Sequence, residues 1–109
     1  MNREAGIKKL GEYRVAIDEV DRRIVGLLNE RTRIVEKLGR IKEQIDMPVY
    51  EPKREDDVFR NISDANEGPL PSEALKRLFE RIVDEMRSLQ HMKRKGRRRD
   101  SGAESKEEV

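Results

Sequence analysis

An apolar heptad seam runs through residues 7–45 and constrains the fold of this chain more than any other feature. Steps of three and four residues from Leu10 meet an apolar side chain at every position except one, which Arg31 occupies. The positions are Leu10, Tyr13, Ile17, Val20, Ile24, Leu27, Arg31, Ile34, Leu38, Ile41 and Ile45. This period is typical of a helix that buries one stripe against partner helices. We therefore predict one long helix over residues 7–45.

The length of this helix indicates a dimer. At a rise of about 1.5 Å per residue it would measure roughly 55 Å, about twice the diameter of a compact domain of ~100 residues. The chain has 109 residues, of which 34% are hydrophobic and 44% charged. The rest of the chain is therefore too short and too polar to cover the whole seam. Because a second copy is the simplest source of the missing surface, we expect an intertwined helical homodimer.

Local stop and start signals predict two further helices. Pro52 suits the first position of a short helix that we expect to end near Ala65, and residues 66–69 (Asn-Glu-Gly-Pro) supply stop signals. A third helix is expected over residues 71–93, with an apolar stripe that ends in the polar residue Gln90. Because no strand pattern occurs, the predicted fold class is all-α, with a long, a short and a medium helix in each chain.

The basic character of the chain is concentrated at its end. Residues 93–109 carry seven Lys/Arg and four Asp/Glu, a net charge of +3, whereas residues 1–92 carry a net charge of −1. After Gly96 the sequence has almost no apolar side chains, which predicts disorder. We therefore divide the chain into a helical domain of residues 1–92 and a charged, disordered tail of residues 93–109.

Composition excludes several kinds of chemistry. The chain has no cysteine and a single histidine, His91, which leaves no thiolate nucleophile, no disulfide framework and no multi-His metal site within one chain. The opening residues lack the apolar run of a signal peptide. No segment approaches the ~18 to 20 apolar residues of a membrane helix. We expect a cytoplasmic protein without a membrane partner, whose chemistry needs no covalent attack and no tightly held metal.

Cations near the seam are candidates for an anion-binding site. Arg31 and Lys42 are eleven residues apart, which places them about 20° apart around the helix and ~16 Å apart along it. Both could hold one small dianion. Arg14 lies on the same row as Lys42 but ~42 Å away, so it can join only from an antiparallel second chain, which predicts two shared sites per dimer. From spacing alone, a register device explains Arg31 equally well, a solvated charge explains Lys42 better, and Gln90 alone suits a helix end.

The order of several short motifs adds a resemblance to a known family. They are R-x-x-I-D-x-x-D from Arg14, L-x-x-R ending at Arg31, the lysine Lys42, P-V-Y-E-P-K-R-E over residues 48–55, and the late Gln90. Over residues 10–90 this succession resembles the all-helical chorismate mutase family. The resemblance implies the pericyclic rearrangement of chorismate to prephenate in the shikimate pathway, on the way to phenylalanine and tyrosine. It implies neither a cofactor nor a covalent intermediate.

The resemblance also implies roles for four residues at the reacting part of the substrate. Arg31, together with Arg14 of the second chain, would bind the two carboxylates, for which the planar guanidinium fork is suited. Lys42 would reach a carboxylate and the ether oxygen. Gln90 would donate a hydrogen bond to that ether oxygen from the opposite side.

Three more roles fall on the connector and on the start of the short helix. Glu55 would accept a hydrogen bond from the ring hydroxyl, Glu51 would make a second polar contact there, and Arg54 would support the groups that bind the carboxylate. Met86 departs from the pattern, because some relatives place a small polar residue at this position. A substrate contact from Met86 is therefore in doubt.

Two alternatives remain beside the mutase. An isochorismate-pyruvate lyase of the same fold would use similar cations, although Glu55 and the compact connector favour the mutase. A non-catalytic helical module is the other, because the basic run of residues 93–99 attracts phosphate. No base-reading element accompanies that run, so we expect no nucleic-acid partner and a tail that can be removed without loss of turnover. Docking to another shikimate-pathway enzyme stays open.

Overall fold

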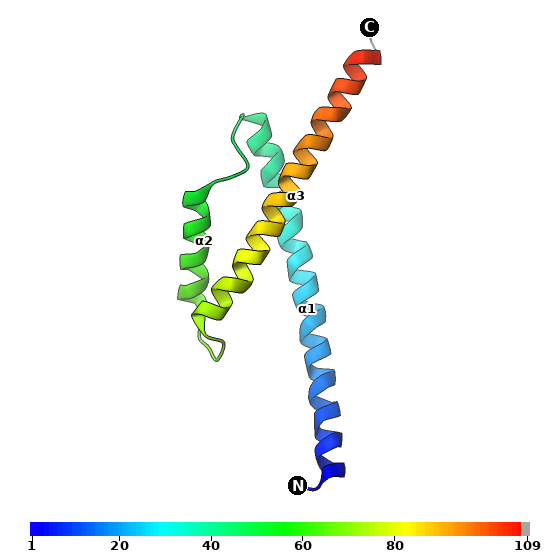
Figure 1. Ribbon diagram of the computed structural model, residues 1–109, viewed down its shortest axis with the longest axis vertical. Helices are drawn as coiled ribbons and strands as arrows, with labels where there is room; N and C mark the ends of the chain where they lie inside the picture. Colours follow the sequence, from blue (N-terminus) through cyan, green and yellow to red (C-terminus); the bar gives the residue numbers. More distant parts are fainter. Residues whose placement is uncertain (108–109) are drawn as a thin grey trace. The chain divides into compact units, whose positions relative to one another are not determined.

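Three helices form the structure, a computed structural model that describes residues 1–107, with side chains to residue 100. They are α1 (Arg3–Gln44), α2 (Pro52–Ala65) and α3 (Ser72–Glu107) (Figure 1). Every regular element in this range is a helix. The predicted all-α class, with three helices in the order long, short and longer than short, is confirmed for the described part of the chain.

The long helix α1 begins four residues earlier than predicted because Asn2 caps it. The Asn2 side chain accepts a hydrogen bond from the backbone N–H of Ala5 at 2.8 Å, which satisfies one of the unpaired donors of the first turn. Glu4 in that turn places a negative charge at the positive end of the helix dipole. The sequence pattern missed this start because the heptad seam itself begins only at Leu10.

The end of α1 is closed by a left-handed residue. The backbone N–H of Met47 donates to the carbonyl of Lys42 at 2.7 Å, and that of Asp46 donates to the carbonyl of Glu43 at 3.2 Å. This pair of bonds is the Schellman arrangement, which needs a positive φ at the residue after the helix. Asp46 supplies it with φ 57°. The turn matters for function because its first carbonyl belongs to Lys42.

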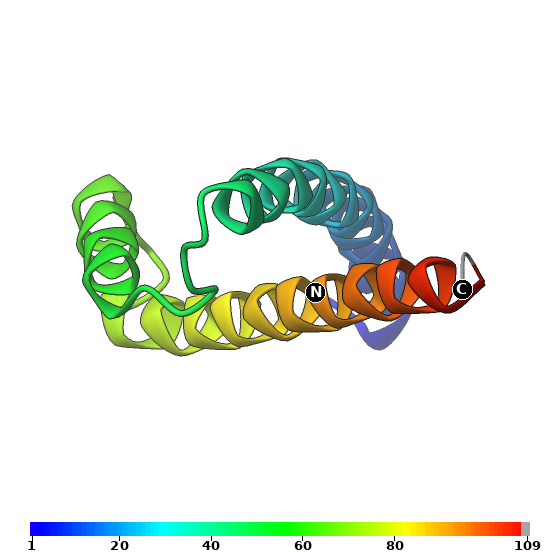
Figure 2. The same ribbon diagram turned by 90° about the horizontal axis from the view of Figure 1, so that it is seen from above.

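The short helix α2 has the predicted bounds, Pro52–Ala65, with Pro52 in its first turn. Its connection to α3 is built around Asn66, whose side chain donates to the Leu70 carbonyl and to the Ser72 hydroxyl at 2.9 and 3.0 Å. Gly68 takes a φ of 79°, which favours glycine. α2 packs against α3 (Figures 1 and 2).

The third helix is longer than predicted. Its expected end near Lys93 is wrong, because α3 continues to Glu107. The residues beyond Lys93 are rich in Arg, Lys and Glu, which are good helix formers, and Arg94 and Arg97 contact residues near the end of α1. The boundary between a helical domain and a disordered tail stays a prediction, and these two contacts favour a boundary after Arg97. The last two residues of the predicted tail lie outside the described range.

The chain divides into two compact units, residues 1–34 and residues 35–109. The second unit holds the last turns of α1 together with α2 and α3. Its core is small: Val49, Val83 and Met86 are the apolar side chains that are buried among the described residues, and they lie beside the buried Lys42.

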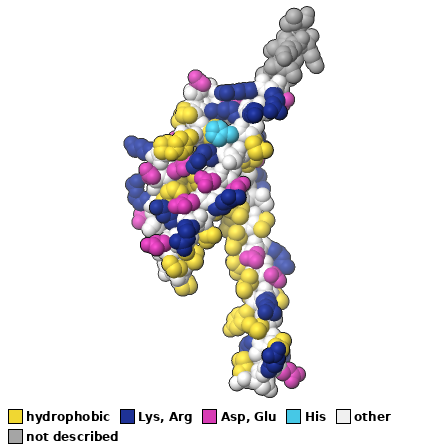
Figure 3. Space-filling model, viewed as in Figure 1, with side chains coloured by type: hydrophobic (Ala, Val, Ile, Leu, Met, Phe, Trp, Pro, Cys, Tyr) yellow, Lys and Arg dark blue, Asp and Glu magenta, His cyan; other side chains and the backbone are white. Residues whose placement is uncertain are grey.

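The first unit is a single stretch of α1 whose apolar seam is open. The exposed fractions of its seam residues range from 43% at Val20 to 66% at Tyr13. Figure 3 shows apolar side chains at the surface along this stretch. Within the described residues, no helix combines the length and the apolar character needed to cross a membrane.

Candidate functional site

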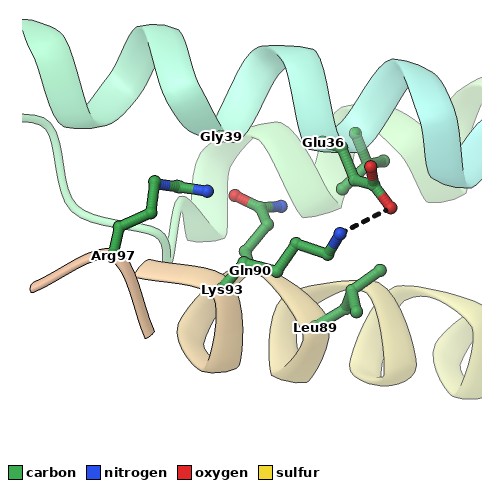
Figure 4. A pocket seen from close by; sticks show the side chains of 7 residues that line it. Glu36, Gly39, Leu89, Gln90, Lys93 and Arg97 are labelled. Carbon is green, nitrogen blue, oxygen red and sulfur yellow. Dashed lines mark ion pairs between the residues drawn. The ribbon is translucent and has the colours of Figure 1, made fainter. Parts of the chain in front are cut away.

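A hollow lies between the last turns of α1 and the second half of α3. Its lining residues are Val35, Glu36, Gly39, Leu89, Gln90, Lys93 and Arg97 (Figure 4). They all belong to the second unit, and we call this feature the α1–α3 hollow. It is open to solvent and holds about 210 Å³ of empty space. Three of its side chains are charged, and two of these are cations.

Gln90 lies across Gly39 at the centre of this hollow. A Cβ atom at Gly39 would lie 3.5 Å from Cγ and 3.6 Å from Oε1 of Gln90, so the missing side chain gives the amide its place. Oε1 is buried and has no hydrogen-bond partner among the described residues. In Figure 4 the amide nitrogen points towards the side of Lys93 and Glu36. The amide therefore presents its donor along the hollow.

Lys42 lies on α1 one turn after Gly39, and its exposed fraction is 7%. Its ammonium group donates to the carbonyl of Val49 at 2.9 Å and pairs with a carboxylate oxygen of Glu51 at 2.5 Å. The connector after α1 thus folds back over the lysine. An ammonium group has three N–H donors, and these contacts occupy two of them. The third can serve a ligand.

Glu51 is the N-cap residue of α2, but its side chain does not cap the helix. The prediction placed this carboxylate near the positive end of the α2 dipole, where it would contact the substrate. The structure instead directs it to Lys42, whose positive charge it partly balances. The opposite charge at 2.5 Å is a stronger attraction than the helix end.

Glu55 is held by a cation that the sequence did not single out. Arg87 of α3 donates to both carboxylate oxygens of Glu55, at 2.6 and 3.1 Å, in the paired geometry that guanidinium groups favour. The same guanidinium group lies over the ring of Tyr50, 5.0 Å from its centre. Each oxygen of Glu55 keeps lone pairs that can accept a ligand hydroxyl.

The remaining predicted residues are not in this group of contacts. Arg54 is exposed on the first turn of α2. Arg14 and Arg31 belong to the first unit, where Arg14 is exposed and Arg31 is half-buried. Met86 is buried in the core, so packing explains the departure noted in the sequence.

Four charged residues of the second unit were missed by the sequence pattern. Arg87 is one, and the others are Glu36, Lys93 and Arg97 of the hollow. Lys93 and Arg97 follow Gln90 by three and seven residues, which is the spacing of one helix face. That signal was available only if the third helix was taken beyond Lys93.

This arrangement defines a class of small helical protein that binds an anion beside a neutral amide donor. A buried lysine and a glutamine lie on neighbouring turns, close to further arginines, and no group of three or more metal-binding side chains occurs among the described residues. The sequence model of the chorismate mutase type II family matches residues 13–91. The chain belongs to this family, and the predicted resemblance is confirmed.

Curated relatives and solved structures agree with this assignment. The bifunctional chorismate mutase/prephenate dehydratase of Aquifex aeolicus is 34% identical over 88 residues, which cover 77% of this chain and 24% of the relative. The chain thus spans about a quarter of the length of that relative. The chorismate mutase of Methanocaldococcus jannaschii is 38% identical over 56 residues, which cover 51% of this chain and 57% of the relative.

Among solved structures, the chorismate mutase of Thermus thermophilus (form II) has a TM-score of 0.74 and 34% identity, and the match covers 76% of this chain and 94% of that one. The chorismate mutase of Helicobacter pylori in complex with prephenate has a TM-score of 0.71 and 28% identity. This second match covers 77% of our chain and 91% of the other.

Proposed function

We propose that this chain is a chorismate mutase, which converts chorismate to prephenate by an intramolecular rearrangement. The observation that carries the proposal is the placement of Lys42 and Gln90 on neighbouring turns, with Gly39 between them. Both residues were assigned to the ether oxygen of the substrate from the sequence. The Helicobacter pylori neighbour was solved in complex with prephenate, which supports the choice of substrate.

The chemistry follows from where negative charge develops. The breaking ether bond leaves negative charge on its oxygen in the transition state, and donors fixed in advance stabilise such charge better than water does. Lys42 is held by Val49 and Glu51 and keeps one N–H for this oxygen. Gln90 adds a neutral N–H from α3. Binding in one conformation supplies the remaining acceleration, because the flexible side arm of the substrate must lie over the ring.

The carboxylates of the substrate require further cations. We propose Arg31 of the same chain and Arg14 of a second chain for them, as the sequence spacing predicts, with Arg54 in support. Glu55, oriented by Arg87, accepts the ring hydroxyl, and Glu51 lies beside it.

A second copy completes the site in this proposal. The α1–α3 hollow holds about 210 Å³, less than the ~300 Å³ at the lower end of small-molecule sites. The apolar seam of α1 is exposed at Ile17 and Ile24, by 57% and 48%, and a large open apolar stripe marks a protein interface. An intertwined homodimer covers the seam and brings Arg14 to the other chain's site.

The direct test offers the purified chain chorismate and, separately, isochorismate. The proposal expects prephenate from chorismate, and only background amounts of salicylate and pyruvate from isochorismate. Salicylate with pyruvate as the dominant products would identify a lyase. A chain that turns over neither compound would contradict the proposed function altogether. Lys42→Ala is the matched negative control for activity from contaminating enzyme.

A further inference from the structure

The part of α3 that follows the family match binds the end of α1 at three points. Lys93 pairs with Glu36 at 3.2 Å. Arg97 directs two nitrogens, each at 2.6 Å, to one carboxylate oxygen of Glu43. Arg94 donates to the backbone carbonyl of Met47 at 2.8 Å. We call residues 93–97 the clasp.

The clasp holds the turn that surrounds Lys42. Glu43 follows Lys42 directly in the chain. Met47, whose carbonyl accepts from Arg94, donates its own N–H to the Lys42 carbonyl at 2.7 Å. The ammonium group of Lys42 then bonds to the Val49 carbonyl further along the same connector. A continuous series of hydrogen bonds therefore joins Arg94 to both ends of the lysine.

The contacts of the clasp differ from ordinary surface pairs. Most other ion pairs of the described residues join positions three or four apart on one helix, and their acidic partners are half-exposed or more, as at Glu19 and Glu85 with 64% and 62%. Glu36 and Glu43 are each only 25% exposed and lie 57 and 54 residues before their partners. Partly buried pairs are screened less by salt than exposed ones.

The clasp also borders Gln90. Lys93 and Arg97 line the α1–α3 hollow together with this amide, and Figure 4 shows both side chains on the face of α3 that carries Gln90. Lys93 neutralises Glu36, whose carboxylate would otherwise repel an anion in the hollow. The sites of Lys42 and Gln90 thus share one support.

We propose that the clasp positions Lys42 and Gln90 for catalysis, with Arg94 and Arg97 as positioning residues that touch no substrate. This inference rests on the proposed function for its kinetic consequence only. It replaces the expectation that residues after Lys93 can be removed without effect. Small displacements of a catalytic group cost large factors in rate. Loss of the clasp is therefore expected to lower kcat roughly ten- to a hundredfold.

A charge-exchange cycle on the full chain tests this role. Arg97→Glu and Glu43→Arg each place like charges together and are expected to lower kcat more than they raise KM. The double variant restores opposite charges and is expected to recover most of the rate. The matched control is Arg98→Glu, which makes the same change at an exposed neighbour and should leave kcat near that of the parent chain. Arg97→Lys, which keeps the charge, should lie between.

A second measurement does not depend on turnover. Hydrogen exchange at the backbone amides of residues 43–49 is expected to accelerate in Arg97→Glu and to return in the double variant, while Arg98→Glu stays unchanged. If the parent chain does not convert chorismate, the proposed function fails and this exchange alone decides the clasp. Equal exchange and equal kcat in Arg97→Glu and Arg98→Glu would overturn the clasp, and so would a double variant that recovers neither.

Two shortened chains add an arm that needs no charge change. A chain that ends at Arg99 keeps the clasp and is expected to match the parent in kcat and in exchange at residues 43–49. A chain that ends at Met92 lacks the clasp and is expected to lose both. Full activity and parental exchange in the shorter chain would overturn the inference.

Discussion

A glutamine at the reacting bond lets the site act without a titrating donor. Gln90 has no ionisable group, and its amide is placed by the missing side chain of Gly39. Its N–H is therefore available at every pH at which the chain is folded. The buried Lys42 supplies the charge on the other side, so the proposed pair combines one cation with one neutral donor.

Replacement of Gln90 by glutamate should make turnover depend on pH. A carboxyl group donates a hydrogen bond only while protonated, and as a carboxylate it would repel the developing charge on the ether oxygen. As pH rises the proton is lost, so kcat of Gln90→Glu is expected to be highest in acid and to fall towards neutral pH. The parent chain is expected to stay flat across the neutral range. Matching pH profiles for the two proteins would remove Gln90 from the reaction.

Arg31 allows a separate test of whether the interruption of the seam is functional. Arg31→Ala is expected to keep the helical fold and the dimer, because alanine is a better helix former than arginine. Its kcat/KM for chorismate is expected to fall about a hundredfold through loss of a carboxylate partner. Arg33→Ala, at an exposed position on the same helix, is the control and should be near-normal. Circular dichroism that shows unfolded Arg31→Ala would make this arginine structural.

At the scale of elements, the sequence predicted what depends on local signals. The bounds of α2 were predicted correctly because Pro52 and the turn after Ala65 are marked by residues that act within a few positions. The end of α3 was not, because composition reports the charge of residues 93–97 but not their partners on α1. The same reason explains the site. Lys42 and Gln90 follow from a pattern along one helix, whereas Arg87 depends on the packing of α3 on α2.

The turn that ends α1 predicts a stabilising substitution. Asp46 adopts φ 57°, and this region costs an L-residue about 1 kcal/mol or more relative to glycine. Asp46→Gly is therefore expected to raise the free energy of unfolding by about 1 kcal/mol, and Asp46→Ala to lower it. Urea denaturation at one fixed protein concentration measures both, since the stability of a dimer depends on concentration. A less stable glycine variant would contradict this account of the turn.

At the scale of the whole molecule, the exposed seam predicts that two chains fold around each other. Few apolar side chains are buried within the described part of a single chain, whereas the seam leaves large apolar residues open along most of α1. Burial of one such isoleucine contributes about 1.5 to 3 kcal/mol. A stripe of this length is therefore the main source of stability in the proposed dimer.

Two substitutions on α1 separate the seam from the rest of the helix surface. Ile17 lies on the seam and Val15 off it, and in a single chain their exposed fractions are similar, 57% and 68%. Ile17→Asp would bury a carboxylate in the dimer at a cost of several kcal/mol. It is expected to give monomers or unfolded chains in sedimentation equilibrium, and to lose turnover because Arg14 no longer reaches the other chain. Val15→Asp should remain an active dimer. If both variants sediment as the parent does, the seam is not the interface, and the shared site with Arg14 falls with it.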